Sequence, residues 1–138
     1  MSHENVDVVR AAYEAWNVRD MDAFRKLHDP DTIIVRGLQG WPEAGPFVGR
    51  EAVMRLFEGL RETWDEDTME PISLIDIGDR AVARQVWHGV GRGPDLNMDQ
   101  TVVFTLRNGK IFLYEYFWQY AEALEALGLS EQDAHVDS

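Results

Sequence analysis

The sequence predicts an α+β fold in which helices pack on one face of a curved, antiparallel sheet. Two observations support this prediction. Helical periodicity is confined to the first half of the chain and to a short segment near its end, and long β-type runs fill most of residues 69–119. A third observation is the pair Asn108-Gly109, which lies between two dense apolar runs and is typical of a tight hairpin turn. Segregated helices and strands of this kind indicate two packed layers.

The first half of the chain is expected to be mainly helical. Val6, Val9, Tyr13 and Trp16 recur with the period of an amphipathic helix. Six Gly and Pro residues between positions 37 and 49 indicate a loop. We expect helices over 4–18, 21–28 and 50–64, and a short strand over 32–35.

The second half is expected to be a run of strands followed by one short helix. Gly128 suits the position after that helix, where a left-handed residue closes the last turn. The polar tail from 130 to 138 is expected to be frayed. The 138 residues as a whole fit a single domain, 1–138. We expect strands over 69–77, 80–90, 97–107 and 110–119, and a helix over 121–127.

A two-residue turn at Asn108-Gly109 also predicts which residues face each other in the hairpin, because loop length sets the register. Arg107 would then face Lys110, and the pairs farther out would be Thr105–Phe112, Val103–Tyr114, Thr101–Tyr116 and Asp99–Trp118. On the neighbouring strand, a turn near Pro94 would place Trp87 opposite Thr101 and Gln85 opposite Val103.

This register separates the sheet into two faces. Aromatic rings with scattered polar groups are typical of a small-molecule cavity, and they gather on the first face. Its members are Gln85, Trp87, Asp99, Thr101, Tyr114, Tyr116 and Trp118. The second face is apolar, and a monomer seldom leaves such a patch exposed, so it predicts a homodimer interface. Its members are Val86, His88, Val102, Phe104, Leu113 and Phe117.

Composition excludes several classes of function. A net charge of −12 argues against binding of nucleic acid or of an anionic membrane surface. The chain has no cysteine, no pair of histidines at metal-ligand spacing and no phosphate-binding loop, so neither a metal nor a cofactor is expected. Without a signal peptide or an apolar run of membrane-spanning length, the expected location is cytoplasmic.

Four stretches resemble a known family. Residues 5–31 and the segment GPFVGREAV at 45–53 are similar to the opening of a SnoaL-like domain, and RNGKI at 107–111 and AEALEALGL at 121–129 are similar to its end. The resemblance implies membership of the nuclear transport factor 2-like superfamily. Its fold would be a cone-shaped barrel of a strongly curved, mostly antiparallel sheet with three helices on its concave face, an internal pocket and usually a homodimer. Members include polyketide cyclases, isomerases, epoxide hydrolases and dehydratases, so the resemblance implies little about the reaction.

The catalytic residues of two member enzymes have no equivalents here. The ketosteroid isomerase acid and base would fall at Ala12 and Arg36. The arginine and aspartates of limonene epoxide hydrolase would fall at Gln85, Trp87 and Tyr116. Neither reaction is implied.

The candidate site residues therefore come from the predicted cavity face. Asp99 would be a general base and Tyr116 a hydrogen-bond donor to a carbonyl, while the alternatives are a solvated rim carboxylate and a packed core ring. The predicted substrate-binding residues are Trp16, Arg36, Gln85, Trp87, Thr101, Tyr114 and Trp118. Two other regions are expected to face water, namely Arg61 and the acidic run Asp65-Glu66-Asp67.

Three functions are compatible with these residues. The first is binding or cofactor-free conversion, as an isomerase, cyclase or dehydratase, of a small hydrophobic polyketide-, terpenoid- or steroid-like compound. The second is ligand binding without catalysis, and the third is a dimeric interaction module whose cone is filled by its own side chains.

Overall fold

The computed structural model describes residues 4–38 and 46–129, and the predicted frayed tail at 130–138 lies outside these ranges. The first half forms helices and two short strands, and the second half forms four long strands and a last helix. In chain order the elements are α1 (Glu4–Asn17), α2 (Met21–Lys26), β1 (His28–Arg36), β2 (Phe47–Val48), α3 (Arg50–Glu62), β3 (Glu66–Ile77), β4 (Arg80–Val90), β5 (Leu96–Arg107), β6 (Lys110–Phe117) and α4 (Tyr120–Ala126).

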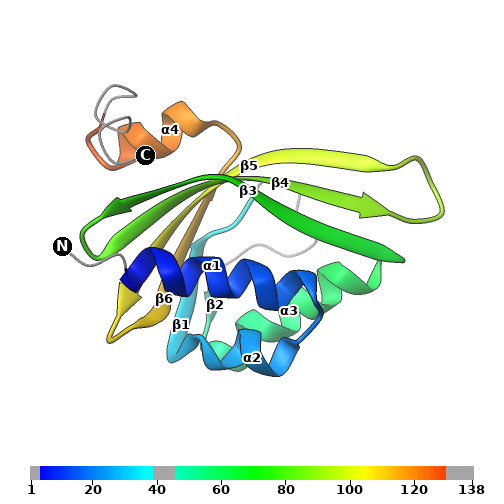
Figure 1. Ribbon diagram of the computed structural model, residues 1–138, viewed down its shortest axis with the longest axis horizontal. Coiled ribbons are helices and arrows are strands. Elements are labelled where there is room, and N and C mark those ends of the chain that lie inside the picture. Colours follow the sequence, from blue (N-terminus) through cyan, green and yellow to red (C-terminus); the bar gives the residue numbers. More distant parts are fainter. Residues whose placement is uncertain (1–3, 39–45, 130–138) are drawn as a thin grey trace.

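One curved sheet of six strands, in the order β2-β1-β6-β5-β4-β3, organises the molecule. Its neighbouring strands run antiparallel, apart from the parallel pair β1 and β6. Figure 1 shows α1, α2 and α3 on the concave side of this sheet and α4 on the opposite side. The α+β cone expected from the sequence is therefore confirmed. Among the described residues, no helix has the length and apolar character needed to cross a bilayer.

The concave face carries the larger hydrophobic core. Side chains from α1 and α3 meet alternate residues of β4, β5 and β6, because successive side chains of a strand point to opposite faces. The strand residues in this core include Ala81, Ala83, Val102, Phe104, Tyr114 and Tyr116.

The convex face carries a smaller core beneath α4. Val82, Val103 and Phe117 point outward from the sheet and pack against Ala123 and Leu124 of the helix. Leu124 is 1% exposed. Part of the apolar outer face is therefore covered by the chain's own C-terminal helix.

The predicted register of the β5–β6 hairpin is wrong beyond its first pair. Arg107 does pair with Lys110, but a bulge follows, and Thr105 pairs with Leu113 instead of Phe112. The Arg107 guanidinium lies 3.8 Å from the centre of the Phe112 ring and also pairs with Asp29, which favours the extra residue at this point. Farther out the pairs are Phe104–Tyr114, Val102–Tyr116 and Thr101–Phe117.

The shift moves the residues of β5 to the opposite faces. Tyr114 and Tyr116 lie on the concave side as expected, but their neighbours are Val102 and Phe104, which were expected on the outer face. Phe117 does point outward, where α4 covers it.

The predicted pairing of β4 with β5 is also wrong. Trp87 pairs with Met98 and Gln85 with Gln100, because the connection between the two strands spans residues 91–95 and is longer than a tight turn. Asp99 consequently lies opposite Val86, and Thr101 opposite Arg84, both outside the concave face.

Candidate functional site

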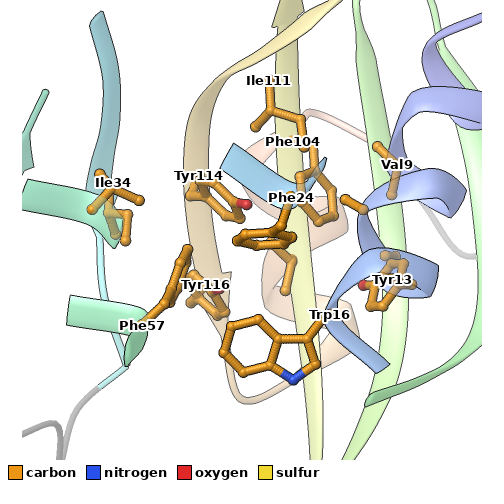
Figure 2. Close-up of a cluster of buried hydrophobic side chains, with 14 of the residues drawn as sticks. Val9, Tyr13, Trp16, Phe24, Ile34, Phe57, Phe104, Ile111, Tyr114 and Tyr116 are labelled. Carbon is orange, nitrogen blue, oxygen red and sulfur yellow. The ribbon is translucent and has the colours of Figure 1, made fainter. Parts of the chain in front are cut away.

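A cavity of about 230 Å³ opens between the concave face of the sheet and the helices α1 and α3. Its walls are mostly aromatic, and Figure 2 shows Trp16, Phe57 and Tyr116 converging from α1, α3 and β6. The lining residues are Trp16, Leu38, Phe57, Leu60, Arg61, Thr63, Trp64, Met69, Gln85, Trp87, Met98, Gln100, Tyr116 and Trp118.

A much smaller void of about 20 Å³ lies deeper in the cone. It shares Trp16, Phe57, Gln85 and Tyr116 with the main cavity and is otherwise closed by residues such as Tyr114. A void of this size has room for about one water molecule. The cone is therefore filled at its narrow end and hollow at its wide end.

The walls are held by edge-to-face ring contacts, a preferred geometry for aromatic pairs. The rings of Trp16 and Phe57 are 5.9 Å apart at an angle of 82°, and those of Trp64 and Trp87 are 4.9 Å apart at 74°. A Cβ atom at Gly89 would lie 2.2 Å from the Trp87 ring. The glycine therefore leaves the space that this ring occupies.

Asp67, at the start of β3, fixes two of the cavity tryptophans from behind. Trp16 Nε1 donates to its Oδ2 at 2.7 Å, and Trp87 Nε1 donates to the same oxygen at 3.4 Å. Arg61 Nε donates to Oδ1 at 2.7 Å, and the Arg61 guanidinium carbon lies 3.9 Å from the centre of the Trp16 ring. The Asp67 side chain is fully buried. The expectation that Arg61 and Asp67 face water is wrong, because each satisfies the charge of the other inside the protein.

A chain of polar side chains crosses the floor of the cavity. The Tyr13 hydroxyl donates to Gln85 Oε1, and Gln85 Nε2 donates to Gln100 Oε1 at 2.7 Å. Burial, followed by the proximity of Tyr116, raises the pKa of the Tyr13 hydroxyl, so this group stays protonated and acts as a donor.

A buried histidine holds the second tyrosine. His28 Nδ1 donates to the Phe24 carbonyl oxygen at 2.7 Å, and its Nε2 accepts from the Tyr114 hydroxyl at 2.5 Å. Burial lowers the pKa of His28 to about 4, so the ring is neutral near pH 7. The Tyr114 ring is stacked on that of Tyr116 at 5.8 Å, and burial raises the pKa of both hydroxyls.

The structure places the predicted site residues in four locations. Trp16, Gln85, Trp87, Tyr116 and Trp118 line the main cavity. Tyr114 lines the deeper void. Asp99 and Thr101 line a groove of about 610 Å³ on the convex face, which shares Gln85, Gln100 and Trp118 with the main cavity.

Arg36 lies away from the cavity lining. Its Nε donates to the Tyr116 carbonyl oxygen at 3.1 Å, and its guanidinium carbon lies 4.4 Å from the centre of the Phe117 ring. The role of Asp99 as a base stays a prediction, but its place on the cavity face is corrected by the observed register.

Several residues of the site could not be found by reasoning from the sequence. Asp67 stands in an acidic run that looks solvated, and Gln100 was expected on no particular face. His28 was expected at the end of a helix, but it is the first residue of β1 and 0% exposed. In the described part of the chain, no group of three or more His, Asp or Glu side chains is placed to hold a metal ion.

The fold and the cavity define a class of protein, the cone-shaped α+β domains with a pocket at the wide end. The model of the SnoaL-like domain matches residues 9–114, so the chain belongs to the SnoaL-like domain family. Comparison with curated proteins gives no match.

Solved structures share this fold at low sequence identity. Bal32a, from a soil-derived mobile gene cassette, is 21% identical with a TM-score of 0.76, over 83% of this chain and 88% of that one. TerC, co-crystallised with polyporic acid, is 20% identical with a TM-score of 0.73, over 91% and 98% of the two chains. Rv0760c from Mycobacterium tuberculosis, in complex with estradiol-17β-hemisuccinate, is 14% identical with a TM-score of 0.72, over 85% and 95%.

Proposed function

We propose that this SnoaL-like protein binds a small, flat, hydrophobic molecule in the cavity at the wide end of the cone. The observation that carries the proposal is the lining itself, in which four tryptophans, Phe57 and Tyr116 surround a hollow of about 230 Å³. Aromatic walls with a few polar groups are the usual make-up of a ligand pocket.

The volume limits the size of the ligand. Pockets for drug-sized molecules have volumes of about 300–1,000 Å³, so this cavity suits a compound of two or three fused rings. A larger polyketide-, terpenoid- or steroid-like compound would extend past Trp118, a cavity residue that is 41% exposed. The ligands bound by TerC and Rv0760c support a cyclic compound of this general kind.

Binding is better supported than conversion. The Tyr116 hydroxyl is protonated and can polarise a ligand carbonyl, as a cofactor-free isomerase, cyclase or dehydratase would need. However, no carboxylate lines the cavity among the described residues. Asp99 would act as a base only on a molecule that reaches the convex groove.

A titration of tryptophan fluorescence with 9-fluorenone tests the binding proposal. The flat tricyclic probe should quench the emission with saturable, one-site behaviour, because tryptophans form the walls. Met98→Phe, which fills the cavity from β5, should weaken binding at least tenfold. Thr105→Phe, on the convex face of the same strand, should bind like the unmodified protein. Equal affinity of the two variants would refute the proposed site.

A second titration separates binding from catalysis. Asp99→Asn should leave the affinity for 9-fluorenone unchanged, because Asp99 lies outside the cavity. If a substrate is found, loss of turnover in Asp99→Asn would support the role of this residue as a base. Unchanged turnover would refute it.

We also propose that the protein forms a homodimer through the convex face, over the part that α4 leaves open. Val86 and His88 lie there with Ile72, which is 56% exposed. Sedimentation velocity at micromolar concentration should show a dimer, and Ile72→Glu should shift it toward monomer. A monomeric unmodified protein would refute this assembly.

A further inference from the structure

Several of the polar groups that line the cavity are engaged by the protein itself. Arg61 donates three hydrogen bonds, from Nε to Asp67, from Nη2 to the Trp16 carbonyl oxygen and from Nη1 to Met21 Sδ. The Thr63 hydroxyl donates to the Leu60 carbonyl oxygen. These groups therefore contribute to the shape of the cavity more than to recognition of a ligand.

Gln100 is different, because its amide nitrogen has no hydrogen-bond partner among the described residues. Its Oε1 accepts from Gln85 Nε2 at 2.7 Å. In the described part of the chain the one fully buried side-chain polar atom without a partner is Arg50 Nε, so Gln100 Nε2 is reached by solvent. The residue is only 8% exposed and lies between Met98 and Val102 on the concave face. Gln100 borders both the main cavity and the convex groove, and its position on the concave face directs its side chain toward the main cavity.

The orientation of the Gln100 amide is set by Tyr13, through the hydrogen bonds that link Tyr13 to Gln85 and Gln85 to Gln100. A Tyr13 hydroxyl that donates leaves Gln85 Oε1 as the acceptor, and Gln85 must then present Nε2 to its cross-strand neighbour. Gln100 accordingly accepts this hydrogen bond with its Oε1 and presents the two N–H bonds of its Nε2 to the cavity. Reversal of the Gln100 amide alone would place its Nε2 against Gln85 Nε2, donor to donor.

We propose that Gln100 is the residue that determines ligand specificity, and that it selects a ring compound bearing an oxygen acceptor, such as a ketone or quinone carbonyl. Tyr13 and Gln85 are positioning residues that keep its N–H bonds aimed at that oxygen. The proposal rests on the proposed binding function. The lining is mostly apolar, so a compound without an acceptor would leave the Gln100 N–H groups unpaired when it displaces water from the cavity.

Matched probes test this specificity. 9-Fluorenone and fluorene have the same three fused rings, and only the first has a carbonyl oxygen. Replacing Gln100 by Met removes the donor and keeps the side-chain length, and it should reduce the preference for fluorenone over fluorene roughly tenfold, the effect of about one buried hydrogen bond. Gln119→Met is the control, since Gln119 is exposed outside the cavity and makes no side-chain cap contact to α4.

The infrared stretching band of the bound carbonyl reports the hydrogen bond directly. In the unmodified protein the band should lie below its position in hexane, and in Gln100→Met it should return toward that position. Tyr13→Phe should reduce the same preference by a smaller factor, but it should have no further effect in the Gln100→Met background, because it acts through Gln100.

The possible outcomes are distinct. If neither probe binds the unmodified protein, the binding function itself fails. If both bind but Gln100→Met changes neither their ratio nor the carbonyl band, the binding function stands and the role of Gln100 is refuted. Loss of the band shift in Tyr116→Phe but not in Gln100→Met would also refute it and assign the donor to Tyr116. Near-ultraviolet circular dichroism confirms that each variant is folded, and the band of the unmodified protein tests for a hydrogen-bonded carbonyl without any substitution.

Discussion

Asp67 Oδ2 accepts the indole hydrogen of Trp16 at 2.7 Å, across 51 positions of sequence. The same carboxylate balances Arg61, whose guanidinium covers the face of the Trp16 ring. One ion pair therefore holds a wall of the cavity in place, with Arg61 in the lining and Asp67 behind it. Because the pair is buried, each charge depends on the other for its stability.

Replacing Asp67 by Ala should destabilise the protein strongly. The change leaves the Arg61 charge buried without its partner and removes the acceptor of the Trp16 and Trp87 indoles, which predicts a loss of about 3–5 kcal/mol in the free energy of unfolding. Urea denaturation measures this loss. Asp65→Ala, in the same acidic run but exposed, should change the free energy by less than about 0.5 kcal/mol. Similar values for the two variants would contradict the role of Asp67.

The ends of several elements were predictable, because they depend on local signals, but β1 begins at residue 28 and not 32, and β3 begins at residue 66 and not 69. The hairpin turn is where Asn108-Gly109 predicted it, and both residues have positive φ angles, of 53° and 75°. The strand β4 spans 80–90 as expected, and the helix α3 covers most of the range predicted for it.

The faces of the strands were less predictable, because a single bulge reverses them. The sequence near Phe112 does not indicate a bulge. The contacts that favour the bulge come from Arg107 and, through that side chain, from Asp29, which is distant in sequence. Tyr116 and Asp99 were both predicted on the cavity face. Tyr116 lines the cavity, whereas Asp99 lies on the other side of the sheet. Buried charges such as Asp67 are invisible for the same reason, as their partners are distant in sequence.

Replacing Gly89 by Ala should disturb the cavity without changing a lining residue. The new Cβ would lie 2.2 Å from one ring atom of Trp87 and 2.9 Å from Trp64, so both rings must move. We expect a loss of about 1–3 kcal/mol in stability and a changed near-ultraviolet circular dichroism spectrum. Gly93→Ala is the matched control, because no atom lies within 4 Å of its Cβ position. An unchanged tryptophan spectrum in Gly89→Ala would contradict the close packing.

Replacing Leu124 by Ala tests whether α4 forms a second core on the convex face. The side chain is 1% exposed and packs with Val103 and Phe117, so its truncation should cost about 2–5 kcal/mol in the free energy of unfolding. Glu125→Ala, one position farther on the exposed side of the helix, should have little effect. If the two variants unfold at the same urea concentration, α4 does not contribute to the fold in this way.

The buried His28 should make the protein less stable in mild acid. Its pKa is lowered from 6.5 to about 4 by burial, so the unfolded chain binds a proton more readily than the folded one between these values. The contribution of His28 to the free energy of unfolding should therefore be constant above pH 6.5. It should fall by about 3 kcal/mol in total as the pH drops toward 4.

Urea unfolding at pH 7.5 and pH 4.5 measures this dependence, and His28→Gln separates it from other groups. The variant should be less stable at pH 7.5, since the contacts to Tyr114 and Phe24 change, but the fall between the two pH values should be much smaller. His88→Gln, on the convex face, should keep the full fall. Asp29 does not affect the comparison, because hydrogen bonding to Arg107 lowers the pKa of its carboxyl. The contribution of Asp29 to stability is therefore lost only as the pH falls below the ordinary aspartate pKa. An equal fall in His28→Gln and in the unmodified protein would show that the histidine is not the acid-sensitive group.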